Sequence, residues 1–197
     1  MYSRAKGDSD KRPFGTQLDV RAVGYEWINH SIATTQLSSH DFRIQIGGNA
    51  CKQPYSISRF NISAMSFGAL SANAVLALNL GAKRGGFAHD TGEGSISRHH
   101  RTHGGDLIWE IGSGYFGCRD ATGHFSPERF TENVKSEQVK MVEIKLSQGA
   151  KPGHGGVLPG AKVTEEIAEA RGVGIGEDCV SPSSHSSFST PLELMQF

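Results

Sequence analysis

A glycine-rich loop carrying cationic and amide side chains follows one extended run of this chain. The run begins at Val139; its far end holds Lys145, and Gln148 and Lys151 come soon after. Glycines alternate with these side chains, so the backbone can come close to a ligand. Two basic groups and an amide suit a dicarboxylate better than a neutral ligand. Lys145 could instead pair with Glu143, or place its charge against an electron-rich cofactor ring.

Two earlier loops hold further groups that could bind a ligand. In HDTGEGSIS, Glu93 lies between glycines with Thr91 close by, and its carboxylate could bind a substrate or hold a cationic group. A solvated loop acid explains the same residue. In ISAMSFGA, the small or flexible residues Ala64, Met65 and Ser66 would let backbone N–H groups face a planar ligand. An ordinary strand-to-helix turn remains the alternative for that segment.

Three β–loop–α units position these loops. The apolar runs 60–65, 87–89 and 139–146 are predicted strands, and one of the three loops follows each run. Along the third strand, Met141, Glu143 and Lys145 should share one face, opposite Val142, Ile144 and Leu146. Further strands are predicted at 107–111 and 179–180, and helix starts at the capping residues Ser71, Ser126, Thr164 and Thr190.

Repeated βα units predict an α/β fold with a parallel sheet, either doubly wound or a (β/α)8 TIM barrel. The first loop lacks the GxGxxG pattern expected of a doubly wound nucleotide-binding fold. Ligand-binding loops after successive strands favour the barrel, although a whole barrel needs roughly 250 residues. We therefore predict an irregular N-terminal lead-in over residues 1–55 that packs on the barrel. Residues 56–197 are predicted to form roughly the first three to four βα units of a barrel truncated at its C-terminus.

Charge and cysteine content exclude several classes of protein. Lys plus Arg and Asp plus Glu number 20 each, so no global field attracts nucleic acid or an anionic membrane. The three cysteines form no CxxC pair, which argues against a disulfide framework and against a zinc or iron–sulfur site. No segment has the pattern of a signal peptide or a membrane span. A cytoplasmic enzyme is the expectation.

Two other features have a structural and a functional interpretation. His99, His100 and His103 could place two imidazoles on one helical face, but no nearby cysteine or carboxylate completes a metal-binding set with known spacing. A polar loop is therefore favoured, and no metal is expected. Cys118, in GYFGCRD, is favoured as a buried thiol over a nucleophile.

The loop motifs together resemble the FMN-binding synthase domain of glutamate synthases. The N-terminal segments RAKG, PFGTQ and GYEWINHSI look more specifically like the stand-alone FMN-binding glutamate synthase family proteins. Nearly the whole chain takes part in the resemblance, with the motifs in the family's order. The segments that carry it are SAMSFGALS, TGEG over 91–94, GDLIWEIGSGYFGCR, VKMVEIKLSQGAKPGHGGVLP and SP…H…FSTP over 181–191.

The resemblance implies a (β/α)8 barrel that holds FMN at the mouth of its strands. In the family reaction, 2-oxoglutarate and ammonia give an imino acid, which reduced flavin converts into glutamate by hydride transfer. An electron-donor protein is a possible partner, and no nucleic acid or membrane is expected to be one. Carried over by motif, the cofactor-binding residues are Ala64, Met65, Ser66, Thr91 and Lys145; the substrate-binding residues are Glu93, Gln148 and Lys151; and the catalytic residues are Lys145 and Glu93.

The chain departs from the family pattern in several places. Ser95 stands where the family's GEGG motif has its second glycine. The cysteines of the family's iron–sulfur cluster, the glutamine-hydrolysing domain and the later strands that hold the flavin phosphate have no counterpart in the sequence. We therefore expect this chain alone to bind FMN weakly and not to turn over. Two alternatives remain: a non-catalytic flavin- or anion-binding module, and a truncated gene product without a function of its own.

Overall fold

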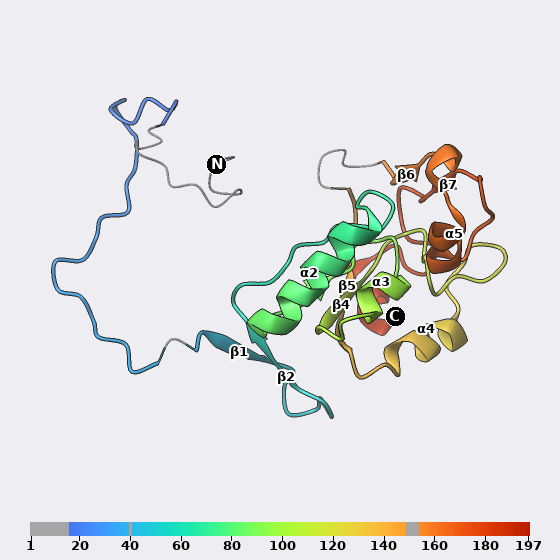
Figure 1. Ribbon diagram of the computed structural model, residues 1–197, viewed down its shortest axis with the longest axis horizontal. Coiled ribbons are helices and arrows are strands. Elements are labelled where there is room, and N and C mark those ends of the chain that lie inside the picture. Colours follow the sequence, from blue (N-terminus) through green and yellow to red (C-terminus); the bar gives the residue numbers. More distant parts are fainter. Residues whose placement is uncertain (1–15, 40, 149–153) are drawn as a thin grey trace. The chain divides into compact units, whose positions relative to one another are not determined.

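The computed structural model describes residues 16–39, 41–148 and 154–197 (Figure 1), and the chain divides into two units, residues 1–40 and 41–197. In the first unit, residues 16–39 form turns and bends without a helix or strand. The rings of Tyr25 and Trp27 contact edge to face there, with centroids 5.1 Å apart. The predicted domain boundary at residue 55 stays a prediction.

The second unit opens with an antiparallel hairpin of β1 (Arg43–Ile46) and β2 (Tyr55–Ser58). The Arg43 guanidinium donates a hydrogen bond of 2.6 Å to the Gly86 carbonyl at the end of the first long helix. The Tyr55 hydroxyl donates to the Asp106 carboxylate at 2.8 Å, and Ile57 on β2 is buried against Ala88 and Ile108. These contacts attach the hairpin to the start of the central sheet.

The central sheet is parallel and has the strand order β3 (His89–Asp90), β4 (Leu107–Ile111), β5 (Val139–Ile144). The strand predicted over 60–65 is wrong as an extended element, because only Ile62 pairs with the sheet. Its N–H donates to the Ala88 carbonyl, and its carbonyl accepts from the Asp90 N–H. The chain then turns at Ser66, whose carbonyl accepts two backbone N–H groups, so no longer ladder forms.

The helices begin where the capping residues predict. Ser71 accepts a hydrogen bond from the Ala74 N–H at the start of α2 (Ala72–Gly85), and left-handed Gly86 ends that helix. Ser126 caps α4 (Pro127–Val134) in the same way. Figure 1 shows these two helices beside the sheet. The shorter elements are α3 (Arg98–Arg101), α5 (Glu165–Arg171), α6 (Pro191–Gln196), the 3₁₀ turn η1 (Gly160–Lys162) and the antiparallel pair β6 (Val157–Leu158) and β7 (Cys179–Val180).

The two faces of the central sheet differ in chemistry. Leu107, Trp109 and Ile111 pack on one side, where the Trp109 ring stacks on Phe130 of α4 at 5.6 Å. On the other side Ile108 packs with Met141. Glu110 and Lys145, which belong to the candidate site, lie farther along the same face. The predicted alternation is therefore confirmed from Met141 to Lys145. The architecture is mixed α/β with a parallel sheet.

Candidate functional site

The three loops singled out in the sequence meet at the carboxyl ends of the parallel strands. β3 runs directly into the segment Thr91–Gly94, and β5 into Lys145. The Lys145 N–H still donates to the Ile111 carbonyl at 2.9 Å, so its backbone is fixed to the neighbouring strand. Ligand sites in parallel α/β folds form at this edge of the sheet.

The first and second loops pack backbone against backbone. The Gly94 N–H donates to the Ser66 hydroxyl at 3.2 Å. Gly92 has a φ of +67°, and a Cβ on it would lie 2.5 Å from the Ser66 nitrogen and 2.7 Å from the Met65 carbonyl carbon. Only glycine fits such a contact, which explains one of the glycines around Glu93.

Four of the five residues predicted to hold the flavin lie on these two loops, and the fifth, Lys145, follows β5. Ala64 is exposed, and Met65 and Ser66 are half-buried. Within the described part of the chain, their three backbone N–H groups donate no hydrogen bond, so they remain free for a ligand. Thr91 differs: its buried hydroxyl accepts from the Glu110 N–H and donates to the Gly92 carbonyl. That hydroxyl joins β3 to β4.

The predicted catalytic pair, Lys145 and Glu93, forms an ion pair across the second and third loops. The Lys145 Nζ lies 3.2 Å from the Glu93 Oε2 and 3.7 Å from the Glu110 Oε1. Gln148 donates from its Nε2 to the same Glu93 oxygen at 2.9 Å. Two of the predicted substrate or catalytic groups thus converge on the carboxylate of a third, Glu93. Lys151 lies outside the described residues.

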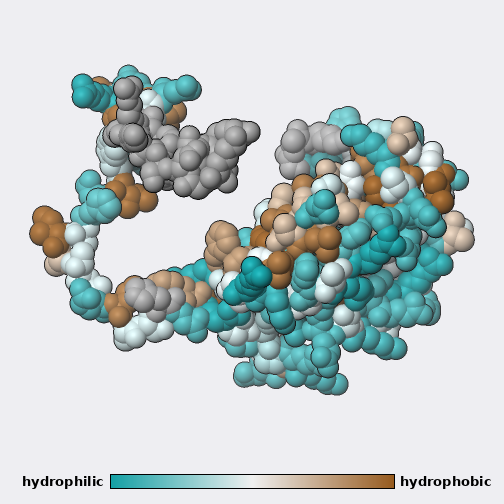
Figure 2. Space-filling view, viewed as in Figure 1, coloured by the Kyte–Doolittle hydropathy of each residue, from teal (hydrophilic) through white to brown (hydrophobic). Residues whose placement is uncertain are grey.

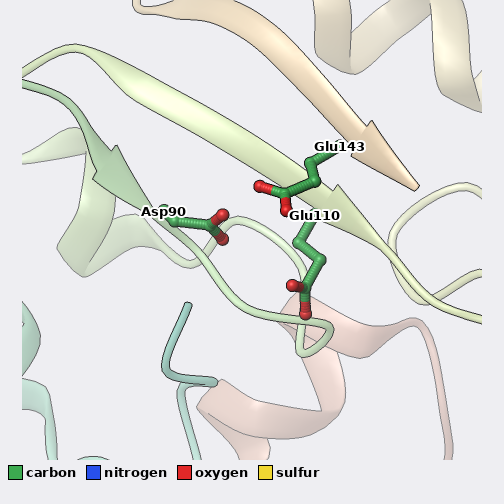
Figure 3. Close-up of side chains that lie close together, drawn as sticks. All are labelled: Asp90, Glu110 and Glu143. Atoms are coloured by element: carbon green, nitrogen blue, oxygen red, sulfur yellow. The ribbon is translucent and has the colours of Figure 1, made fainter. Parts of the chain in front are cut away.

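The structural interpretation of Lys145, an ion pair with Glu143, is wrong about the partner. That interpretation paired Lys145 with Glu143, two residues earlier on the same face, but Glu93 and Glu110 are the carboxylates that it contacts. The Glu143 carboxyl turns instead toward Asp90 and Glu110, as Figure 3 shows. This partner choice links β5 to the loop after β3.

Asp90, Glu110 and Glu143 form a carboxyl cluster that the sequence reasoning did not assign to the site. Each offers an oxygen within 4.8 Å of the others. Burial raises the pKa of Asp90 to about 8, helped by a hydrogen bond with Glu143 and opposed by the Gly92 N–H. Burial also raises the pKa of Glu110, while the Lys145 charge opposes that rise. Both shifts favour a protonated carboxyl in the cluster.

A divalent cation is the other species that three carboxylates could hold. The cluster already has a cationic neighbour, since Lys145 contacts Glu110. Protonation of Asp90 further lowers the negative charge available to a metal. A signal for this cluster was present in the sequence: Glu110 is the one charged residue in the apolar run LIWEI, whose residues are all buried.

Two more residues form hydrogen bonds with backbone carbonyl groups of the site loops. The His185 Nε2 donates to the Lys145 carbonyl at 2.8 Å, and its Nδ1 forms a hydrogen bond of 3.1 Å with the Tyr115 hydroxyl. Arg171 is 4% exposed and donates to the Phe67 carbonyl at 3.2 Å. His185 lies in the SP…H…FSTP segment, which had no assigned role. Sequence alone could not show that it contacts a strand 40 residues earlier.

Ser95 takes up the conformation of the glycine that it replaces in the motif. Its φ is +70°, and it is 1% exposed. Its hydroxyl lies against Gly117, where a Cβ would collide with it. The side chain is therefore housed beside Gly117, away from Glu93. Ser95, which departs from the family motif, is accommodated because its neighbour Gly117 has no side chain.

The histidine cluster and Cys118 lie apart from this site. His99 contacts the Glu166 carboxylate at 3.1 Å, whereas His100 is buried with its Nδ1 beside the Ser97 hydroxyl. Burial raises the pKa of the Cys118 thiol to about 12, so it is a structural thiol, as predicted. Among the described residues, no helix is long and apolar enough to cross a membrane.

Comparison with known proteins decides the family. The conserved region in glutamate synthase matches residues 27–197. The chain belongs to the glutamate synthase family. A glutamate synthase large subunit-like protein of Bacillus subtilis, YerD, is 42% identical over 154 residues, which cover 77% of this chain and 29% of that protein. The archaeal-type glutamate synthase [NADPH] of Thermotoga maritima is 37% identical over 137 residues, covering 68% of this chain and 24% of that enzyme.

A further relative is the archaeal glutamate synthase [NADPH] of Methanocaldococcus jannaschii, 36% identical over 135 residues, which cover 68% of this chain and 24% of that enzyme. The chain thus spans less than a third of the length of these glutamate synthase relatives. The resemblance read from the loop motifs is confirmed at the level of the family.

Proposed function

We propose that this chain forms part of an FMN-dependent glutamate synthase-type oxidoreductase that converts 2-oxoglutarate and ammonia into L-glutamate through an imino acid. The observation that carries the proposal is the convergence of Lys145 and Gln148 on Glu93, beside free backbone donors of the first loop. The names of the relatives support the same reaction class.

The proposed fold is the first part of a (β/α)8 barrel. Three parallel strands lie in sequential order, and site loops follow β3 and β5 at their carboxyl ends, which agrees with that architecture. The chain would need later strands to close the sheet and to provide a flavin phosphate site. We propose that residues 1–197 alone bind FMN weakly and do not turn over. A purified chain that retains tightly bound FMN or forms glutamate would contradict this.

The first loop fits a flavin because it offers polar donors on small residues. The N–H groups of Ala64, Met65 and Ser66 would hold the polar edge of the ring, together with the Lys145 ammonium, while Thr91 would fix the loop at their side. When bound, FMN supplies the hydride that reduces the imino acid. Lys145 adds a positive charge that is only 26% exposed, so solvent screens it weakly.

The carboxylates would handle the nitrogen and the proton. Glu93, 13% exposed, would hold the cationic imino group, with Gln148 and Lys151 binding the substrate carboxylates. Condensation of 2-oxoglutarate with ammonia releases water and needs a proton. The Asp90, Glu110 and Glu143 cluster beside Lys145, in which burial favours a protonated carboxyl, would supply that proton. An electron-donor protein or NADPH would be the source of electrons.

A chimera tests these roles in a complete enzyme. This chain would replace the matched segment of the Thermotoga maritima enzyme, and flavin absorbance and glutamate formation would be measured separately. Glu93→Gln should lower the rate of glutamate formation by about 100-fold or more, since it removes the charge that holds the imino group. Glu137→Gln, an exposed residue outside the site, is the matched control. Equal rates in both variants would refute the role of Glu93.

A further inference from the structure

A second concave site lies beside the end of the second loop, lined by Ser95 and Ile96. It is a pocket of about 490 Å³ bounded by α3, α4 and the carboxyl end of α5. Its floor contains Ser95, Ile96 and Gly117, so it begins where the segment Thr91–Gly94 ends. Figure 2 shows a predominantly hydrophilic surface over these helices. The volume is within the usual range for small-molecule sites, about 300–1,000 Å³.

Arginines dominate the lining of this pocket. Five guanidinium groups face two carboxylates, those of Glu132 and Glu169. In residues 41–148 and 154–197, Arg98 alone among the five has a carboxylate within ion-pair distance, that of Glu166. The other four arginines of the lining are Arg101, Arg119, Arg129 and Arg171.

Three of these four arginines contact neutral groups, so their charge is not cancelled by a carboxylate. Arg101 donates to the Asn133 side-chain oxygen at 3.0 Å. Arg119 and Arg171 pack over the Phe116 ring, 5.5 and 4.9 Å from its centroid. The Arg171 Nε is buried and has no hydrogen-bond partner in the described part of the chain. Aromatic and amide contacts fix the orientation of a guanidinium but leave it able to bind an anion.

We propose that this pocket binds a small phosphate monoester, with Arg101, Arg119 and Arg129 on the phosphate. A guanidinium fork matches phosphate oxygens in a bidentate way, and a doubly charged group can engage several forks at once. Glu132 and Glu169 would accept hydrogen bonds from hydroxyl groups on the rest of the ligand. A nucleic acid fits less well, because the site is concave, contains carboxylates and belongs to a chain of zero net charge. This site does not depend on the proposed flavin chemistry.

Titration calorimetry on the full chain, with glycerol 3-phosphate, inorganic phosphate and glycerol as probes, tests the site. Glycerol 3-phosphate should bind more tightly than inorganic phosphate, and glycerol should not bind. Arg129→Gln should weaken phosphate binding by about tenfold or more, because it removes a charge-assisted contact. Arg84→Gln removes the same charge from the exposed end of α2 and should leave the affinity unchanged.

Removal of a negative charge from the pocket lining gives a second, independent test. Glu132→Gln removes a carboxylate from the lining and should tighten inorganic phosphate binding by about threefold. Thermal melts of each variant would verify the fold. The proposal is overturned if no saturable binding occurs up to about 10 mM of either phosphate probe. It is also overturned if Arg129→Gln and Arg84→Gln reduce binding equally, or if Glu132→Gln weakens it.

Discussion

Gly92→Ala tests whether the first two loops pack as the structure shows. The substitution puts a Cβ in a residue with φ of +67°, which costs about 1–2 kcal/mol in a left-handed conformation. The same Cβ would lie 2.5 Å from the Ser66 nitrogen, and forced overpacking against this backbone adds about 1–3 kcal/mol. The expected loss in the free energy of unfolding is therefore about 2–5 kcal/mol.

Gly104→Ala separates the two contributions. Gly104 has a φ of +66°, and nothing lies within 4 Å of a Cβ added to it. This variant should lose only the conformational part, about 1–2 kcal/mol. Urea unfolding of the two variants and the wild type, with equal denaturant slopes, gives the comparison. Equal losses for Gly92→Ala and Gly104→Ala would refute the close packing of the second loop on Ser66.

Three further outcomes follow from buried titratable groups and thiols. The pKa of Asp90 is raised to about 8 in the folded chain, so the stability that its protonated form contributes is lost as pH rises from about 4 to 8. Urea midpoints of the wild type should therefore fall over that range more than those of Asp90→Asn. Burial lowers the pKa of His89 to about 4, so the wild type should lose stability as pH falls from about 6.5 to 4. Thermal melts of His89→Leu should show a smaller loss of stability over this range. An equal loss would contradict the lowered pKa of His89. Cys51 is exposed, whereas Cys118 and Cys179 are buried, so a thiol reagent should modify one cysteine in the native protein and all three after denaturation. Rapid modification of Cys118 in the native protein would contradict its burial.

Local patterns predicted most of the elements that carry the site. Capping residues such as Ser71 and Ser126 act on the neighbouring backbone, so the helix starts could be inferred from nearby sequence. The convergence of Glu93, Gln148 and Lys145 could also be foreseen, because parallel strands end at a common edge. The strand over 60–65 could not be judged in this way, because its pairing depends on a neighbour and only Ile62 forms it.

The contacts that were missed depend on long-range register. Glu110 lies opposite Glu143 because β4 and β5 pair in that register, with an irregularity between Leu107 and Ile108. No local pattern fixes that offset, so the carboxyl cluster and the true partners of Lys145 could not be derived from spacing. The same holds for Ser95, whose unusual conformation is tolerated because Gly117 leaves room for its side chain.

Isotope tracing tests the central claim most directly. The flavin-loaded chimera would receive ¹⁵N-ammonium, 2-oxoglutarate and NADPH, and the products would be analysed by mass spectrometry. The proposed function predicts L-glutamate that carries the ¹⁵N label, with no labelled glutamate when 2-oxoglutarate is omitted. A chimera that binds flavin and oxidises NADPH but forms no labelled glutamate would contradict the assignment of Glu93, Lys145 and Gln148 to reductive amination.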